Sequence, residues 1–416
     1  MKYFDTPTPV LINALLALIL NSFISQTSAH SQDTRDTRTL TKPELVNMSA
    51  EKLAEAEKLF VEAVENKKVL GYQILVARRG KVVLHSAGGV RDLAEKLPMT
   101  TESLLNLGSM MKSVAAVGLL RLVDQDLLSL EDLVSKFLPG FDLPPSSRIT
   151  VRQLLLHMPG YTSFESFSGG LTPYSTEEPE APSLKLEARQ LGERGPDIEP
   201  GTVFRYNNLG YNVAGAIIEE ISGLKLDQYM KKFIYEPLGM NDTHHDTWNL
   251  DSERVARQYW MRDGQWEVLD GTPPPIARAN GGLISTAWDF AKFCQMLLDQ
   301  GAYGAGEIVS EKLLTLATSP LIEVSAAYLP EEIESQMGLQ SEWYEYRDSR
   351  DLNIDRYRGL GFVVSDAGVF SHAGIYGTFF FVDPARELFG LILTQSIYGG
   401  NPGQAFIAAV NAAVLD

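Results

Sequence analysis

The sequence predicts an α+β fold: one antiparallel sheet formed by N- and C-terminal strands, flanked by helices, with a mostly helical inserted domain. Three observations lead to this prediction. Two β-rich runs flank Arg79-Gly80, as in a hairpin. Three more runs (GLGFVVSD, GTFFFVDP and LFGLILTQ) follow from Gly359, and apolar residues recur at helical spacing in between. Strands joined by short turns pair antiparallel, so both groups fit one sheet.

The individual elements follow from local patterns along the chain. Residues 49–68 read as an amphipathic helix with Ser49 as its N-cap, and a long apolar helix begins at Ser109 and ends near Leu127. Residues 171–200 and 336–357 are rich in proline or charge and predict loops, the first with at most one short helix. In FSHAGIYGTFFFVDP, the motif His372-Ala373-Gly374 is expected to open a strand. A run of helices and turns is expected over 129–139, 149–161, 210–223 and 225–240, and helices are expected over 287–300 and 403–415.

The N-terminus predicts a signal peptide over residues 1–29. Its apolar core, from about Val10 to Ile24, is shorter than the roughly 20 residues of a membrane span. Thr27-Ser28-Ala29 offers small residues for cleavage near Ala29, although retention as an uncleaved anchor stays open. We therefore expect a secreted or periplasmic protein with no stable membrane anchor.

Three parts follow from this organisation: the signal peptide, a flexible leader over 30–48, and a single unit over 49–415. Within that unit, an α/β part covers about 49–108 plus 359–415, and a helical part covers about 109–358.

Composition excludes several classes of function. The chain has 416 residues, of which 44% are hydrophobic, and a net charge of -17, which disfavours nucleic acid as a partner. Its single cysteine, Cys294, lies among apolar residues and is expected to be a small buried hydrophobic side chain. There is no H-E-x-x-H motif and no cysteine pair, so neither a metal nor another cofactor is expected. The oligomeric state has no signal in the sequence.

Candidate chemistry lies in LNLGSMMKSVAAVGLLRLV, residues 105–123. Ser109 and Lys112 share one helical face, and Lys112 is embedded in apolar sequence, where an unpaired charge is costly. A desolvated neutral lysine can act as the base for a serine, which is otherwise a poor nucleophile. The helix N-terminus adds N–H donors for an oxyanion. The same spacing recurs at Ser49–Lys52 and Ser222–Lys225, so the spacing alone is a weak signal.

Two other motifs carry candidate site residues. In FRYNNLGYNVAG, the hydroxyl of Tyr206 could move protons and the amide of Asn208 could hold a substrate carbonyl, the alternative being a Tyr-Asn turn that caps a helix. In FSHAGIYGTFFFVDP, Gly374 would let a ligand approach the backbone, and the N–H of Ile375 could donate to an oxyanion. Here the alternative is a bulge with a surface histidine, His372.

Taken together and in this order, the three motifs resemble the serine β-lactamase and penicillin-binding-protein superfamily. The likeness is greatest to the branch of class C β-lactamases, D-alanyl-D-alanine carboxypeptidases and family VIII esterases, and it covers about residues 50–415. It implies a β-lactamase/transpeptidase-like fold with the site between an α/β and a helical domain. It also implies roles: Ser109 as nucleophile, Lys112 as base or electrostatic helper, Tyr206 as general base and acid, Asn208 as a substrate-positioning residue, and the N–H groups of Ser109 and Ile375 as the oxyanion hole.

One motif departs from the family pattern. Where the family usually has Lys-Thr-Gly, this chain has His372-Ala373-Gly374, which removes a permanent cation and a hydroxyl that would serve a substrate carboxylate. The expected function is therefore a secreted serine hydrolase that acts through an acyl-enzyme on small ester or amide substrates, with an esterase outcome favoured. The alternatives are a β-lactamase, a D-alanyl-D-alanine carboxypeptidase or D-aminopeptidase, and a non-catalytic penicillin-binding-like sensor.

A Ser-His-Asp hydrolase would need a Gly-x-Ser-x-Gly elbow, which the chain lacks. Arg205 is expected to form a surface ion pair, and His157 is expected to be structural.

Overall fold

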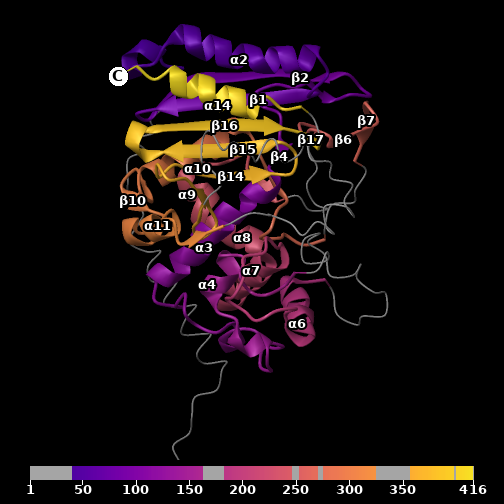
Figure 1. The fold of residues 1–416 in the computed structure, drawn as a ribbon, viewed down its shortest axis with the longest axis vertical. Coiled ribbons are helices and arrows are strands. Elements are labelled where there is room, and N and C mark those ends of the chain that lie inside the picture. The colour runs from indigo at the N-terminus through magenta and orange to yellow at the C-terminus, as the bar shows by residue number, and fades with distance from the viewer. Residues whose placement is uncertain are drawn as a thin grey trace, which may run out of the picture.

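The main sheet joins the two ends of the chain, as predicted. The structure, a computed structural model, describes residues 40–162, 182–245, 253–269, 275–324, 357–397 and 400–415. Nine antiparallel strands lie in the order β11-β12-β13-β14-β15-β16-β1-β2-β3, which confirms the α+β architecture (Figure 1). These strands are β1 (Gly71–Arg78), β2 (Lys81–Asp92), β3 (Leu97–Pro98), β11 (Ile322–Glu323), β12 (Tyr357–Arg358), β13 (Val363–Val364), β14 (Phe370–Gly374), β15 (Thr378–Asp383) and β16 (Leu388–Thr394).

Helices cover both faces of this sheet. On one face, α2 (Ala50–Glu65) packs beside α14 (Gly403–Ala412), with the rings of Phe60 and Phe406 5.5 Å apart. On the other face, α10 (Ala287–Leu298) contacts β1, β15 and β16 and places Phe290 5.4 Å from Phe380. Successive strand residues point to opposite faces, so Ile74 joins the first apolar core and Leu75 joins the second.

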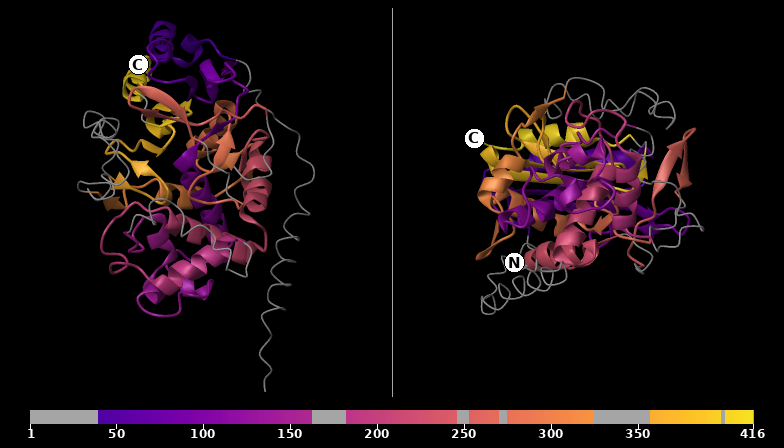
Figure 2. Two further views of the ribbon diagram at one scale, coloured as in Figure 1. Left: turned by 90° about the vertical axis from the view of Figure 1, so that its right-hand side faces the viewer. Right: turned by 90° about the horizontal axis from the view of Figure 1, so that it is seen from below.

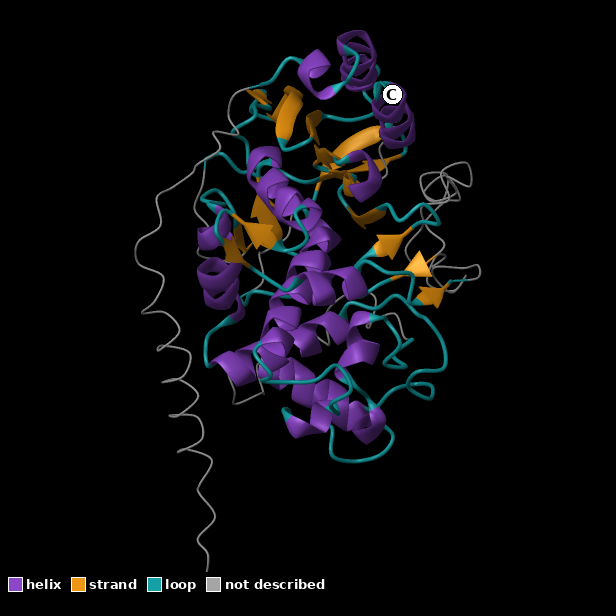
Figure 3. Cartoon of the chain, turned by 90° about the vertical axis from the view of Figure 1, so that its left-hand side faces the viewer, coloured by secondary structure: helices purple, strands orange, loops and turns teal. Residues whose placement is uncertain are grey.

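The remaining helices gather at the other end of the molecule around α3 (Met111–Asp124), which is buried along most of its length (Figures 2 and 3). A 3₁₀ turn, Gly108–Met110, leads into α3. The helix α7 (Leu209–Ser222) packs on α3, and Gly223 ends it in the left-handed conformation. The other helices here are α4 (Val151–Leu155), α6 (Leu184–Arg194), α8 (Leu226–Met230), a π-helical turn at Lys231–Tyr235, α9 (Glu236–Leu238) and α11 (Glu311–Ala317).

Three small sheets connect the two regions. They are β4-β8-β5, β17-β6-β7 and β10-β9. The first carries the chain into the 3₁₀ turn that contains Ser109, so it matters most for the site. The strands are β4 (Leu105–Asn106), β5 (His244–His245), β6 (Tyr259–Arg262), β7 (Gln265–Val268), β8 (Leu283–Ser285), β9 (Ala302–Tyr303), β10 (Gly306–Glu307) and β17 (Ser396–Ile397).

One local prediction was wrong: the motif His372-Ala373-Gly374 closes β14 instead of opening a strand. In the run of helices and turns, 129–139 forms a 3₁₀ turn at Val134–Lys136, and Val134 N–H donates to Ile149 O (2.9 Å) next to a bridge between two segments. The one helix allowed within 171–200 is α6, which is three turns long and buries one face. The predictions for 1–39, 171–181 and 336–356 lie outside the described residues.

The described residues were also compared with the expectations for membrane spans, metal sites and the single cysteine. No helix in the described ranges is both long and apolar enough to cross a membrane. Within the same ranges, no group of three or more histidine, cysteine, aspartate or glutamate side chains could hold a metal ion. The predicted burial of Cys294 is confirmed, and burial raises the pKa of its thiol.

Candidate active site

A short strand and a left-handed glycine bring Ser109 into position. Leu107 N–H donates to Leu283 O (2.7 Å), continuing the β4–β8 pairing. Asn106 Oδ1 accepts from Gly108 N–H (2.9 Å), and Gly108 has a φ of +54°. Glycine takes this conformation without steric cost, so the chain can turn here into the 3₁₀ turn. Ser109 is left half-buried at the start of the long buried helix.

Lys112 is fully buried and points back at Ser109. Its Nζ lies 3.1 Å from Ser109 Oγ and 2.6 Å from the main-chain oxygen of Asn280. Burial lowers the pKa of Lys112 well below its usual value, which favours the neutral amine. A neutral amine has two N–H donors and one lone pair. If one N–H is donated to Asn280, the lone pair remains for the Ser109 hydroxyl proton.

Tyr206 lies on the other side of the lysine amine. The Nζ of Lys112 is 4.8 Å from the centre of the Tyr206 ring. The Tyr206 ring also contacts the ring of His157, with ring centres 4.5 Å apart and ring planes 31° apart. The structure thus brings together the two motifs that the sequence placed almost 100 residues apart.

His157 holds the backbone on both sides of Tyr206. Arg205 N–H donates to His157 O (2.9 Å), and His157 Nδ1 lies 3.2 Å from Asn207 N and 3.1 Å from Asn207 O. The ring is therefore hydrogen-bonded to the main chain of Asn207 in either neutral tautomer. Burial is the largest cause that lowers the pKa of His157, which favours the neutral ring. Its structural role, expected from the sequence, is the positioning of Tyr206.

Replacing His157 with phenylalanine should therefore slow turnover while keeping the stacked ring. The variant leaves the Asn207 main chain without its buried partner, which costs about 1–3 kcal/mol of stability, and lets Tyr206 move. We expect kcat to fall at least about 10-fold with a smaller change in KM. Tyr211→Phe is the matched control, because it also loses one buried hydrogen bond, from Tyr211 Oη to Leu155 O (2.9 Å). Equal activity losses in the two variants would contradict a positioning role for His157.

The two asparagines after Tyr206 have different environments. Asn207 is fully buried, and its Oδ1 accepts from Gly210 N–H (2.9 Å) while its Nδ2 donates to Arg205 O (2.9 Å). Asn208 makes no side-chain cap hydrogen bond and is half-buried. The capping role that was the alternative for this motif thus belongs to Asn207, and the role of Asn208 toward substrate stays a prediction.

The end of β14 lies directly against the turn that holds Ser109. A Cβ added to Gly374 would lie 2.2 Å from Leu107 O, and one added to Gly108 would lie 3.1 Å from Ile375 N. The side chain of Thr378 fastens this contact, because its Oγ1 donates to Leu107 O (2.9 Å). The N–H groups of Ile375 and Ser109 therefore come from adjacent stretches of backbone, as an oxyanion hole requires.

His372 is not the surface residue of the alternative interpretation. It is 6% exposed, stands opposite Phe380 in the sheet, and its Nδ1 lies 2.7 Å from Ala373 O. Arg205 likewise differs from expectation. Its guanidinium donates to Phe204 O (3.1 Å), and among the described residues no ion pair to it is found.

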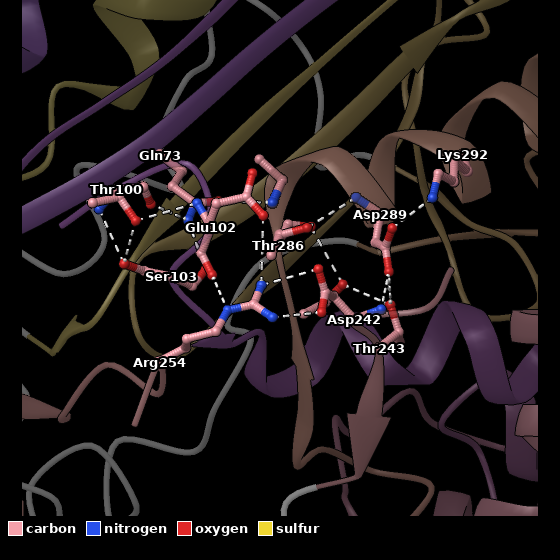
Figure 4. Close-up of polar contacts among 12 residues, drawn as sticks. Gln73, Thr100, Glu102, Ser103, Asp242, Thr243, Arg254, Thr286, Asp289 and Lys292 are labelled. Atoms are coloured by element: carbon pink, nitrogen blue, oxygen red, sulfur yellow. Dashed lines mark hydrogen bonds and ion pairs between the residues drawn. The ribbon is translucent and has the colours of Figure 1, made fainter. Parts of the chain in front are cut away.

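A polar network behind the site anchors β4, β5 and β8 (Figure 4). Arg254 holds Asp242 through two hydrogen bonds (2.7 and 2.9 Å) and also donates to Glu102 O (2.7 Å). Asp289 accepts from Asp242 N–H (2.6 Å) and from Lys292 Nζ (2.6 Å). The chain entering β4 and the chain leaving α9 are thereby fixed to each other.

The same network includes the N-terminal cap of α10. Thr286 Oγ1 accepts from Asp289 N–H (3.1 Å), but the Asp289 carboxylate bonds elsewhere. Gln73 completes the anchor, because its Oε1 accepts from Ala287 N–H (2.8 Å) and its Nε2 donates to Ser103 O (2.7 Å). One amide of β1 thus ties the start of α10 to the segment that precedes Ser109.

Sequence reasoning missed Asn106 and Asn280. The first had a usable signal, since an asparagine two residues before a glycine is typical of a side chain that bonds its own backbone two residues on. Asn280 acts through its main-chain oxygen, and such a group carries no side-chain signature.

A serine beside a buried lysine at the start of a central helix, next to the end of an antiparallel strand, is the arrangement of serine hydrolases with the β-lactamase fold. The chain belongs to the Beta-lactamase family, whose model matches residues 56–413. This confirms the resemblance to the β-lactamase and penicillin-binding-protein superfamily.

Similar proteins include both esterases and penicillin-binding proteins. The chain is 27% identical to Esterase EstB of Burkholderia gladioli over 389 residues, which are 86% of this chain and 94% of that protein. Penicillin-binding protein 4* of Bacillus subtilis (strain 168) is 30% identical over 196 residues, 47% of this chain and 42% of that protein.

Solved structures share the fold. The octameric penicillin-binding protein homologue from Pyrococcus abyssi has a TM-score of 0.68 at 25% identity, covering 88% of this chain and 78% of its own. EstCE1, a hydrolase with promiscuous acyltransferase activity, has a TM-score of 0.67 at 23% identity, covering 88% of this chain and 99% of its own.

Proposed function

We propose that this protein hydrolyses small ester or amide substrates through an acyl-enzyme on Ser109, with esters as the preferred class. One observation carries the proposal: the buried amine of Lys112 lies 3.1 Å from Ser109 Oγ and is oriented by Asn280 O. A structural lysine would gain nothing from full burial beside a serine, since burying an amine costs free energy.

The geometry supports a two-step reaction. Ser109 Oγ bonds to the substrate carbonyl carbon, and its proton passes to the neutral Lys112 amine. The carbonyl oxygen becomes an oxyanion held by the N–H groups of Ser109 and Ile375, each such donor being worth about 10²–10³-fold in rate. Tyr206, beside Lys112, delivers a proton to the leaving group as the carbonyl–leaving-group bond breaks. Water then attacks the acyl carbon and gives a proton to the Tyr206 phenolate. As the bond between Ser109 Oγ and the acyl carbon breaks, Ser109 takes its proton back from the Lys112 ammonium.

Two features favour esters over substrates that carry a free carboxylate. A histidine at position 372 is neutral at pH 7 unless a partner charges it, whereas the lysine of the usual motif is a permanent cation. The Nδ1 of His372 faces Ala373 O. The similarity to Esterase EstB, which extends over most of both chains, supports the same preference. We further propose secretion or periplasmic export through residues 1–29, with cleavage near Ala29.

The test compares the mature protein with Ser109→Ala on a short-chain p-nitrophenyl ester and on a chromogenic cephalosporin. We expect ester turnover that falls by at least about 10³-fold in the variant, and a mass increase equal to the acyl group on the parent alone. Full turnover by Ser109→Ala would overturn the proposal.

The cephalosporin separates the remaining alternatives. Fast Ser109-dependent cephalosporin turnover would show that His372 replaces the usual lysine, and it would place β-lactamase first. Acylation of Ser109 without release of product would indicate the penicillin-binding sensor. Turnover of D-amino-acid peptides alone would indicate the carboxypeptidase or aminopeptidase class.

A further inference from the structure

The carbonyl that orients Lys112 belongs to a five-residue segment, 278–282, here called the strap. Its Asn280 O lies 2.6 Å from Lys112 Nζ. At its C-terminal end, Gly281 lies against the main chain of Gly108, where an added Cβ would be 3.5 Å from Gly108 O. The chain then enters β8. The strap therefore lies over the lysine amine and against the turn that carries Ser109.

The N-terminal end of the strap is held by a largely buried ion pair. Arg278 Nη2 lies 2.7 Å from Glu187 Oε1 of α6, and the Glu187 side chain is only 4% exposed. The other carboxylate oxygen, Oε2, accepts from Asn212 Nδ2 of α7 (3.1 Å). Two helices of the helical region thus fix the guanidinium that stands two residues before Asn280.

Apolar packing places the next residue of the strap. Ala279 is fully buried, and its Cβ would be 3.0 Å from a Cβ added to Gly215 of α7. Because Arg278 is bonded to Glu187 and Ala279 packs on α7, the main chain at Asn280 has little freedom. The main-chain oxygen of Asn280 is thereby directed at Lys112.

We propose that Glu187 and Arg278 are positioning residues for catalysis, which hold the strap so that Asn280 O orients the amine of Lys112. This inference rests on the proposed function of Ser109 and Lys112. Neither residue was indicated by the sequence motifs. Their effect passes through the main chain of the strap.

A buried ion pair adds little net stability, because removing two charges from water costs about as much as their attraction returns. The effect proposed for this ion pair is to fix the position of the strap. A charge-assisted hydrogen-bond network anchored on two helices can hold a backbone oxygen to within the fraction of an ångström that proton transfer requires. The strap also keeps water from Lys112, so loosening it would let the pKa of the amine rise toward its usual value.

The first test replaces Arg278 with methionine, which keeps the length and apolar stem of the side chain. We expect kcat/KM for the ester to fall about 10–100-fold, mostly in kcat. We also expect the acid limb of its pH profile to move up by about 0.5–1 pH unit. Arg278→Lys should recover part of both effects.

The chain offers a matched control. Lys185 Nζ and Glu220 Oε2 form another ion pair between α6 and α7 (2.5 Å), with side chains 49% and 37% exposed, and no contact to the strap is found for either residue within the described structure. Lys185→Ala should leave kcat/KM within about two-fold and leave the pH profile in place. Equal effects of Lys185→Ala and Arg278→Met, or an unchanged profile in Arg278→Met, would overturn the proposal.

A second variant guards against loss of folding. If Arg278→Met leaves Glu187 charged and unpaired and does not fold, Glu187→Leu/Arg278→Met removes both charges and should recover the thermal midpoint. The proposal requires the double variant to fold while its kcat/KM stays low. A double variant with parental stability, parental rate and parental pH profile would refute it.

Failure of the proposed function would be recognisable separately. If the parent protein shows no Ser109-dependent turnover, the effect of the strap on Lys112 can be measured by NMR. The protein is labelled with ¹³C at the lysine Cε, and Lys112→Met identifies the Lys112 signal. Arg278→Met should then raise the pH at which the Lys112 signal titrates, and Lys185→Ala should not. A Lys112 signal that titrates alike in all three proteins would refute the positioning role independently of any substrate.

Discussion

Lys112→Met should abolish turnover and still fold at least as stably as the parent protein. Methionine fills the volume of the lysine stem without the amine, whose burial is costly. Loss of the base is expected to lower kcat/KM by about 10²–10⁴-fold. The lost hydrogen bond to Asn280 O offsets part of this gain in stability. Ester kinetics and thermal unfolding of the same preparation measure both effects.

The stability difference should depend on pH in a direction set by the lysine. The pKa of Lys112 is lowered by burial in the folded state and lies near 10.5 in the unfolded state. Between these two values the unfolded chain holds more protons, so the stability of the parent rises with pH. The advantage of Lys112→Met should therefore be largest at neutral pH or below and should shrink as the pH approaches 10.5. An advantage that grows with pH would contradict this burial cost.

The chain supplies its own control for this prediction. Lys52 has the same Ser-x-x-Lys spacing with Ser49, but its side chain is 44% exposed and lies 2.8 Å from Glu55. Lys52→Met should leave both turnover and the pH dependence of unfolding close to parental values. A loss of activity there comparable with that of Lys112→Met would mean that neither variant reports on the site.

Gly108→Ala is the second change with a large expected effect. The added methyl would meet Ile375 N at 3.1 Å and Gly374 Cα at 3.4 Å, in a residue whose φ is +54°. Relieving the contact moves the Ile375 N–H away from its place beside Ser109. We expect kcat to fall about 10²–10³-fold, the usual effect of losing one oxyanion donor. A fall in kcat with little change in KM would support the assignment of Ile375 N–H as an oxyanion donor.

Gly223→Ala separates the backbone strain from the contact. Gly223 also has a positive φ, +69°, at the end of α7, but an added methyl there would have nothing within 4 Å. Both variants should lose about 1–2 kcal/mol of stability from the left-handed backbone, and only Gly108→Ala should lose its rate. Retained activity in Gly108→Ala at equal stability loss would rule out this oxyanion hole.

The elements that the sequence predicted well are those whose patterns are local. Helix α2 begins at the expected Ser49 cap, and the hairpin of β1 and β2 turns at Arg79-Gly80. Ser109 lies in the 3₁₀ turn that leads into α3, and residues three apart share one face in either kind of helix, so its contact with Lys112 was predictable from local spacing. The contact of this pair with Tyr206 could be inferred from the family resemblance, and the structure supplies its geometry.

The features that were not predicted depend on distant main-chain groups. Strands of two residues such as β4 and β12 are shorter than any hydrophobic period. Within 129–139 a backbone hydrogen bond from Val134 to Ile149 accompanies a single 3₁₀ turn, and no local pattern indicates that partner. The partner of Lys112 is a carbonyl oxygen 168 residues away, and every residue type carries one. The ion pair of Glu187 and Arg278 joins two unremarkable charged residues that only the fold makes neighbours.

The pairing of β1 with β16 has a consequence for synthesis of the protein. Arg78 bonds through its side chain to Arg386 O, 308 positions later in the chain. While the ribosome is still adding the intervening residues, the first hairpin has one edge without its neighbour, and such edges favour aggregation. The turn that carries Ser109 also lies against Ile375 at the end of β14, so a nascent chain cannot form the proposed site before β14 has been made. Folding of the main sheet is therefore a late event dominated by distant contacts, which are slow to form.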